Sequence, residues 1–243
     1  MIDNLISEGD KIDFRDILTE EQVNGGVSPN VYVSQVFDFT ENGNLMVAMP
    51  MRQRNLVPLS KGQQYEIFFY THKGLYQSIA VIVDRFKSGN VYSMEISLMS
   101  ELRKYQRRQY YRLEKSIAVK YAQITEEEYE AFLRENTMPK RLQGAADFCD
   151  GTSLDISGGG LRFLGSQKIE KARKLVVQFD IVTSNGPVRY CLPAKVIMSF
   201  ELPDRINFFE HRIEFFGISK DSRETLIKYI FEEERKMRKN AKY

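Results

Sequence analysis

The chain has 243 residues, a length that suits one large domain or two small ones. Hydrophobic residues make up 42% of the sequence, which is enough for buried cores. The formal net charge of only +2 excludes a global basic field that would attract nucleic acid or a membrane surface, so any anion site must come from local clustering. Its two cysteines, Cys149 and Cys191, form no CxxC pair, which argues against structural zinc and against a disulfide in a reducing cytosol.

The hydropathy and the N-terminus predict a cytoplasmic protein. No apolar run approaches the ~20 residues that a membrane helix needs, so no membrane insertion is expected. The N-terminal segment "MIDNLISEGDKIDF" mixes acids with apolar residues and lacks the basic start and apolar centre of a signal peptide.

The first hundred residues read as strands. Short alternating or apolar segments are separated by Gly, Asn and Asp, and they cover residues 30–39, 43–50, 63–70, 74–84 and 90–99. The "THKG" stretch at 71–74 between the third and the fourth segment predicts a tight hairpin turn. This spacing is typical of a small antiparallel barrel.

A basic segment, "RKYQRRQYYRLE" at 103–114, follows these strands. It carries five Arg or Lys side chains, three tyrosines and a single acid at its end. Strand patterns resume after it and predict a second barrel, over residues 116–122, 161–165, 174–181, 190–200 and 207–217.

Two helices are expected in the second half. The segment 125–140 begins with Thr125 and Glu128, which fit a capping box, and it should end before Pro139. The C-terminal segment is the clearest helix, because Ser219 or Asp221 can cap it and an apolar side follows, formed by Leu226, Ile227, Tyr229, Ile230 and Phe231.

The predicted fold is therefore all-β with a C-terminal helix, built as two small antiparallel β-barrels joined by a basic linker. The boundaries are an N-terminal barrel at 1–102, a linker at 103–112 and a second barrel with its helix at 113–243. Ligands often bind at such junctions between domains.

Arginines in the basic segment indicate an anion site. Arg108 and Arg112 are four residues apart, with Arg107 and Arg103 upstream. A guanidinium offers a planar fork that pairs with a phosphate or with the O6/N7 edge of guanine, and it can also stack on a purine face.

A second cluster lies at "DISGGGLRF", residues 155–163. Asp155 and Ser157 alternate, so on a strand both side chains lie on one face. A carboxylate accepts hydrogen bonds well from the N1–H and N2–H₂ groups of guanine. The glycines Gly158, Gly159 and Gly160 let the backbone approach a ligand closely or adopt a positive φ. Together the two clusters describe a guanine nucleotide site.

The paired motifs resemble the signature of PilZ domains, RxxxR followed by [D/N]xSxxG. Arg108 and Arg112 match the first motif, and Asp155, Ser157 and Gly160 match the second. The first hundred residues, with "GDKIDF" and a strand-rich barrel, resemble the N-terminal domain of YcgR-like flagellar brake proteins. One departure is visible: an acidic insert around 123–147 lengthens the gap between the motifs.

The resemblance implies a cyclic di-GMP receptor rather than an enzyme. Its ligand would be cyclic di-GMP, with no other cofactor, and its partner a stator or rotor protein of the flagellar motor. Adding the neighbouring arginines and glycines to the matched positions, we expect the binding set to be Arg103, Arg107, Arg108, Arg112, Asp155, Ser157 and Gly158 to Gly160. The extra guanidinium of Arg107 predicts a second bound nucleotide.

Enzyme motifs are missing from the sequence, which contains no GxSxG, HExxH, GxxxxGK[ST] or GxGxxG. Two alternatives stay open: a module that binds single-stranded nucleic acid, which small barrels with basic residues and tyrosines also suit, and a PilZ adaptor that works without nucleotide.

Overall fold

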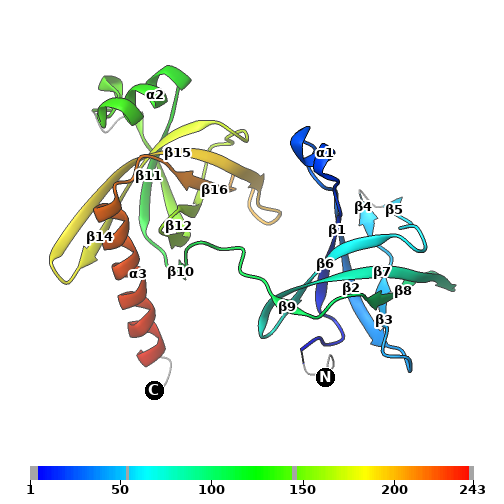
Figure 1. Ribbon diagram of the computed structural model, residues 1–243. Coiled ribbons are helices and arrows are strands. Elements are labelled where there is room, and N and C mark those ends of the chain that lie inside the picture. Colours follow the sequence, from blue (N-terminus) through cyan, green and yellow to red (C-terminus); the bar gives the residue numbers. More distant parts are fainter. Residues whose placement is uncertain (1–4, 53–54, 144–146, 241–243) are drawn as a thin grey trace. The chain divides into compact units, whose positions relative to one another are not determined.

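The computed structural model describes residues 5–52, 55–143 and 147–240, and it consists of two compact units (Figure 1). The first unit is Met1–Arg107 and the second is Arg108–Tyr243. Both units are barrels of antiparallel strands, and the second ends in a long helix, which confirms the predicted fold class. The border between the units falls within the predicted linker at 103–112.

Six strands close the first barrel. In spatial order they are β6 (Gln64–Thr71), β1 (Lys11–Asp16), β2 (Val31–Phe39), β3 (Leu45–Ala48), β8 (Val91–Leu98) and β7 (Gly74–Ser88). Pairing of β6 with β7 closes the ring, and the short strand β9 (Arg103–Lys104) adds to β7. The remaining elements are the helix α1 (Glu20–Asn24) and a small hairpin of β4 (Met51–Arg52) and β5 (Asn55–Leu56).

The core of the first barrel follows from alternation along its strands. On β1, Ile12 and Phe14 are fully buried while Lys11 is exposed and Asp13 and Arg15 are half-buried. The predicted hairpin turn is confirmed, because Thr71 pairs with Gly74 at the end of the β6–β7 ladder. Gly74 has a φ of 124°, a conformation that side chains rarely tolerate.

The second barrel also has six strands. Their order is β12 (Cys149–Ser157), β11 (Ala118–Ile124), β14 (Lys174–Thr183), β15 (Gly186–Glu201), β16 (Phe209–Phe215) and β13 (Gly160–Gly165). Pairing of β12 with β13 closes this ring. A three-residue strand, β10 (Arg112–Glu114), pairs with the 155–157 end of β12, beyond the 149–152 stretch that pairs with β11, and brings the end of the basic segment onto the barrel.

The acidic insert packs on the barrel wall opposite β12 and β13. Its helix α2 (Glu126–Glu135) contacts β14 and β15, and a 3-10 turn, η2 (Lys140–Gln143), follows. The predicted capping box is confirmed, since the side chains of Thr125 and Glu128 each bond the other's backbone N–H. The helix ends at the left-handed residue Asn136.

Helix α3 (Lys220–Asn240) completes the second unit. Ser219 caps it by accepting a hydrogen bond from the backbone of Ser222. Leu226, Tyr229 and Ile230 are buried and join the barrel core, whereas Phe231, predicted on the same apolar side, is 47% exposed. Among the described residues no helix is long and apolar enough to span a membrane.

Candidate functional site

The two sequence motifs meet on one outer face of the second barrel. Arg112 on β10 lies across from Ser157 on β12, and Ser157 lies across from Gly160 on β13. The strand neighbours of the motif positions, Leu113 after Arg112 and Ile156 between Asp155 and Ser157, are buried in the core. Alternation therefore turns the motif side chains outward. Arg108 belongs to the same unit, four residues before Arg112.

A second row of side chains runs parallel to the first, two residues along each strand. It consists of Glu114 on β10, Asp155 on β12, Arg162 on β13 and Arg212 on β16, each across from the next. A bulge between Ser153 and Asp155 on β12 resets the register at this point of the ladder.

Asp155 begins a chain of ion pairs along this face. Arg162 donates from Nε to Oδ2 of Asp155 at 2.6 Å, and its Nη1 lies 3.6 Å from Oε2 of Glu210. Arg212 donates from Nε to Oε1 of Glu210 at 3.0 Å. Asp155 and Glu210 are buried, so these guanidiniums compensate two carboxylates that are largely withdrawn from water.

The positive charge of Arg112 has no direct partner on this face. The Arg112 side chain makes no hydrogen bond or ion pair with any residue that the structure describes. Burial lowers the pKa of its guanidinium; Asp155 opposes this shift, and the nearby Arg108, Arg212 and Arg162 add to it. An anion bound here would relieve that repulsion.

The turn that carries the second motif is held by its own side chain. Ser157 donates its hydroxyl hydrogen to the carbonyl of Gly160 at 3.1 Å and accepts from the backbone of Gly159 at 3.4 Å. None of the three glycines has a positive φ. A Cβ on Gly160 would lie 2.2 Å from the carbonyl oxygen of Ile213, so a neighbouring strand alone requires a glycine here.

The ring of Tyr110 leaves no room for a side chain at Gly158 or Gly159. A Cβ on Gly158 or on Gly159 would come within 2.9 Å of the Tyr110 ring, which packs over the turn. The Tyr110 hydroxyl accepts a hydrogen bond from Nη1 of Arg223 in α3 at 2.7 Å. Tyr110 thus joins the basic segment, the glycine turn and α3.

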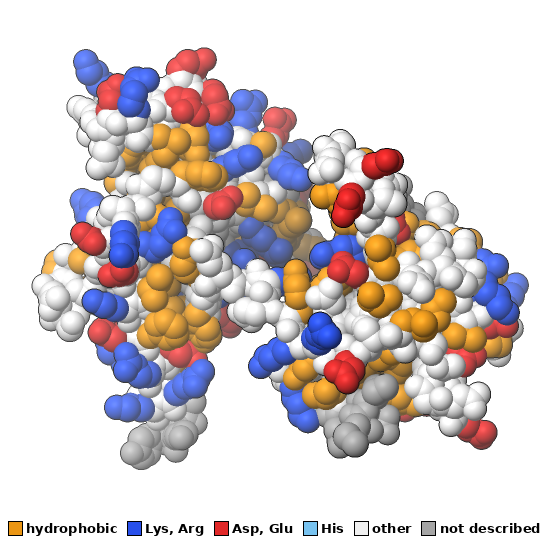
Figure 2. Space-filling view, in the orientation of Figure 1, with side chains coloured by type: hydrophobic (Ala, Val, Ile, Leu, Met, Phe, Trp, Pro, Cys, Tyr) orange, Lys and Arg blue, Asp and Glu red, His pale blue; other side chains and the backbone are white. Residues whose placement is uncertain are grey.

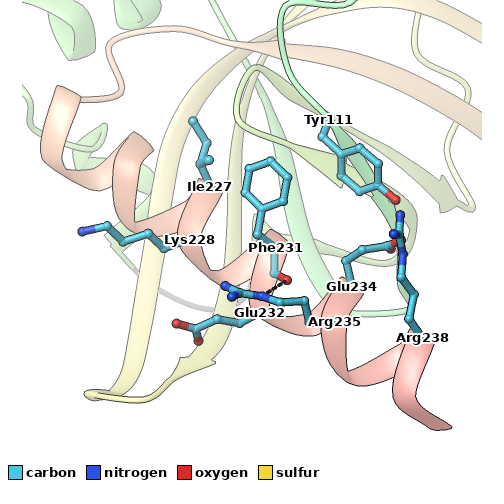
Figure 3. Close-up of a pocket in the computed structure, with 8 residues that line it drawn as sticks. All are labelled: Tyr111, Ile227, Lys228, Phe231, Glu232, Glu234, Arg235 and Arg238. Carbon is cyan, nitrogen blue, oxygen red and sulfur yellow. Dashed lines mark hydrogen bonds and ion pairs between the residues drawn. The ribbon is translucent and has the colours of Figure 1, made fainter.

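Tyr111 also packs the basic segment against α3. Its ring stacks on Phe231 with centroids 5.8 Å apart, beside Glu234 and Arg238 (Figure 3). These residues line an open groove of about 490 Å³. In the close-up the ring of Phe231 lies between Ile227 and Tyr111 (Figure 3). Burial and then Glu234 raise the pKa of Tyr111.

Two predicted site residues belong to the first unit. Arg103 is exposed on β9. Arg107 donates from Nη1 to the Tyr70 hydroxyl at 3.0 Å and lies over the Tyr70 ring, while that hydroxyl donates to Asp13 at 2.6 Å. The structure thus groups Arg108, Arg112 and residues 155–160 in one unit, and places Arg103 and Arg107 in the other.

Sequence reasoning missed Arg162, Glu210 and Arg212. In the sequence they are marked only by their alternation with apolar residues on β13 and β16. Any solvent-exposed charged residue on a strand shows the same pattern. Over the visible face, Lys and Arg side chains are interspersed with Asp and Glu rather than gathered in one field (Figure 2). Within the described ranges no group of three His, Cys, Asp or Glu could hold a metal ion.

Comparison with protein families identifies both units. The model of the PilZ domain matches residues 106–232, and the model described as flagellar protein YcgR matches residues 9–98. No curated protein matches the chain.

Solved structures share the fold of the whole chain. The Bacillus subtilis inhibitor of motility, MotI/DgrA, is 16% identical with a TM-score of 0.71, over 95% of this chain and 99% of that one. YcgR from Escherichia coli, solved in complex with c-di-GMP, is 16% identical with a TM-score of 0.52, over 96% of this chain and 88% of that one. With the RxxxR and DxSxxG residues side by side on a closed barrel, the chain belongs to the PilZ-domain family and carries a YcgR-type domain before its PilZ domain.

Proposed function

We propose that this protein is a cyclic di-GMP receptor that regulates flagellar motility by changing the arrangement of its two units. PilZ-domain proteins are receptors rather than enzymes, and the proposal assigns no catalytic residue. The observation that carries it is the pairing of Arg112 with Ser157, which joins the two halves of the nucleotide motif on one outward face.

The chemistry of this face suits a guanine nucleotide with two phosphates. Arg108 and Arg112 provide forked donors for phosphate oxygens. Arg162 donates only to Oδ2 of Asp155, and Oδ1 accepts no hydrogen bond from the described residues. That oxygen can accept from the N1–H or N2–H₂ group of a guanine, groups that adenine does not offer in the same pattern.

The proposed change in the arrangement of the units depends on Arg103 and Arg107. They belong to the first unit, whereas the motif residues belong to the second. A dianion that engages arginines from both would offset their mutual repulsion and favour one arrangement of the units. That arrangement would present a new surface to a stator or rotor protein at the flagellar basal body. YcgR in complex with c-di-GMP and an inhibitor of motility share the fold, which supports this direction.

Calorimetric titration of the purified chain tests the binding step. Cyclic di-GMP should bind, while cyclic di-AMP and a labelled single-stranded oligonucleotide should bind far more weakly. Tight binding of the oligonucleotide would favour the nucleic-acid alternative, and no binding of any of the three would favour an adaptor that works without nucleotide.

Small-angle scattering tests the conformational step. The radius of gyration should fall when cyclic di-GMP saturates the protein, as two units joined by one segment take up a fixed arrangement. The Arg112→Ala variant at the same nucleotide concentration serves as the control. Identical curves with and without nucleotide would show that the output is not a rearrangement of the units.

A further inference from the structure

Arg212 lies on the same outer face as the nucleotide motif, although it belongs to neither half of it. It is across from Arg162 on the adjacent strand, and Arg162 is across from Asp155. Neighbouring strands are roughly 4.7–4.9 Å apart, so Arg212 is two strand spacings, about 10 Å, from Asp155. A long arginine side chain covers much of that distance.

The contacts of Arg212 leave most of its guanidinium available. Only Nε is used, in the 3.0 Å hydrogen bond to Glu210, and within the described residues its two terminal nitrogens have no partner. The guanidinium lies over the ring of Phe200, 5.5 Å from the ring centroid. Its side chain is 45% exposed, so a ligand on this face can reach the terminal nitrogens.

The need to neutralise the buried carboxylate of Glu210 explains only part of the position of Arg212. Arg162 already lies 3.6 Å from the other oxygen of Glu210 and bonds Asp155 as well. Arg212 is also close enough to Arg112 to contribute, after burial, to the lowered pKa of that guanidinium. A guanidinium added beside Arg108, Arg112 and Arg162 brings unfavourable repulsion, which an electron-rich group bound between them would relieve.

We propose that Arg212 reads the O6/N7 edge of the guanine whose N1/N2 edge faces Asp155. This inference rests on the proposed function and adds a residue that determines specificity to that site. The terminal amino groups of an arginine match the O6 and N7 acceptors of guanine in a bidentate pair. Glu210 and Phe200 hold the guanidinium in place, which reduces the entropy lost on binding.

The choice between an edge contact and a general charge effect can be made with a modified nucleotide. A 7-deaza analogue of cyclic di-GMP carries a C–H in place of N7, so it keeps the charge and the N1/N2 edge but loses one acceptor. If Arg212 contacts N7, the analogue should bind the wild-type chain more weakly, and this penalty should vanish when Arg212 is removed. A double-mutant cycle of this kind isolates the single contact.

The experiment uses calorimetry with both nucleotides on the full chain and on three variants. Arg212→Ala should weaken cyclic di-GMP binding about tenfold or more and abolish the penalty for the analogue. Arg212→Lys keeps the charge without the fork, so it should bind with intermediate affinity. Arg189→Ala, which removes an exposed arginine paired with Asp180, is the matched control and should behave as wild type.

Unfolding midpoints without nucleotide establish that the variants are folded. Cyclic di-GMP affinity of Arg212→Ala equal to that of Arg189→Ala would overturn the inference, with the proposed function intact. Weaker binding of Arg212→Ala that keeps the full penalty for the analogue would also overturn it and assign Arg212 a structural role. A wild-type chain that binds no cyclic di-GMP would overturn the proposed function and the inference together.

Discussion

Arg112 and Ser157 are 45 residues apart in the sequence and directly opposite each other in the β10–β12 ladder. The ladder is only three residues long, from Arg112 to Glu114, and its one buried side chain is Leu113. Backbone hydrogen bonds and one apolar contact thus hold the first half of the motif against the second. The side chain of Arg112 takes no part in this pairing, so it can be changed without removing the strand.

We expect Arg112→Ala to weaken cyclic di-GMP binding about 100-fold or beyond and to leave the fold intact. Hydrogen bonds to charged groups contribute ~1.5–3 kcal/mol each, and this guanidinium can make at least two to the nucleotide. Arg108→Ala should have a similar effect. Arg189→Ala is the control for the lost charge. Calorimetry that finds near wild-type affinity for Arg112→Ala would remove this residue from the site.

We expect Asp155→Ala to weaken binding and to reduce the preference for cyclic di-GMP over cyclic di-AMP. The carboxylate accepts from the N1–H and N2–H₂ edge of guanine, whereas adenine presents N1 as an acceptor. Ser157→Ala should have a smaller effect, because its hydroxyl mainly holds the glycine turn. The measurement is a titration with each dinucleotide.

The Asp155 variant needs its own control, because it also removes the partner of Arg162. The double variant Asp155→Ala with Arg162→Ala leaves no isolated charge at this point. If the double variant recovers the guanine preference of the wild type, the loss in the single variant came from Arg162 and not from a contact with the base.

We expect Gly160→Ala to destabilise the second unit itself. The added Cβ would lie 2.2 Å from the carbonyl oxygen of Ile213, a backbone atom that can move only with its strand. Forced overpacking of this kind costs typically ~1–3 kcal/mol. Gly25→Ala is the comparison, since its Cβ would lie 3.2 Å from the nearest atom at the end of a surface helix. Denaturant unfolding should separate the two variants, and equal midpoints would contradict the packing argument.

Much of the fold was predicted from the alternation of apolar and polar residues along the strands. This alternation placed Asp155 and Ser157 on one face and found most barrel strands, because half-buried strands show a period of two residues. It also identified α3, whose caps and apolar side are local features. The strand β1 was missed because only Ile12 and Phe14 alternate with charged residues there, and α1 because its five residues bury nothing.

Register between distant strands could not be predicted. Arg162 and Arg212 are 50 residues apart, and only the β13–β16 ladder sets them side by side. The bulge between Ser153 and Asp155 shifts the alignment of β12 with β13, which brings Asp155 across from Arg162, and no local sequence feature predicts it. The glycines were predicted to give a ligand clearance, but Tyr110 and Ile213 are the neighbours that require them. Whether they also contact nucleotide stays a prediction.

We expect stability of the second unit to fall between pH 6.5 and pH 4 because of His211. This side chain is fully buried among Tyr121, Phe163 and Phe209, and both of its ring nitrogens lack a partner in the described part of the chain. Burial lowers its pKa from 6.5 to about 4. The unfolded chain therefore binds a proton in this range that the folded chain does not, and the free energy of unfolding rises with pH.

The size of the His211 effect is roughly 2–3 kcal/mol between the two ends of that range. The variant His211→Leu removes the titrating group while keeping an apolar side chain in the core. Its free energy of unfolding should depend less on pH than that of the wild type. Denaturant unfolding at pH 4, 5, 6 and 7 measures this, and parallel curves for the two proteins would assign the acid sensitivity to other groups.

We expect the wild-type chain to bind two cyclic di-GMP molecules and Arg107→Leu to bind one. Arg107 adds a guanidinium next to Arg108, which one dinucleotide held by Arg108 and Arg112 does not need, whereas a stacked pair of dinucleotides brings more negative charge and more purine faces. In the structure Arg107 rests on Tyr70, an uncharged partner. Since a hydrogen bond to a phosphate is stronger than one to a neutral hydroxyl, the nucleotide can displace Tyr70 from the guanidinium.

The number of bound nucleotides is the measurement, from calorimetry or from equilibrium dialysis at saturating cyclic di-GMP. Arg85→Leu changes the charge of the first unit by the same amount at an exposed position on β7, so it should keep the wild-type count. A wild-type titration that ends at one nucleotide per chain would exclude the pair. A count of two in Arg107→Leu would leave the pair in place and show that another group, not Arg107, holds the second molecule.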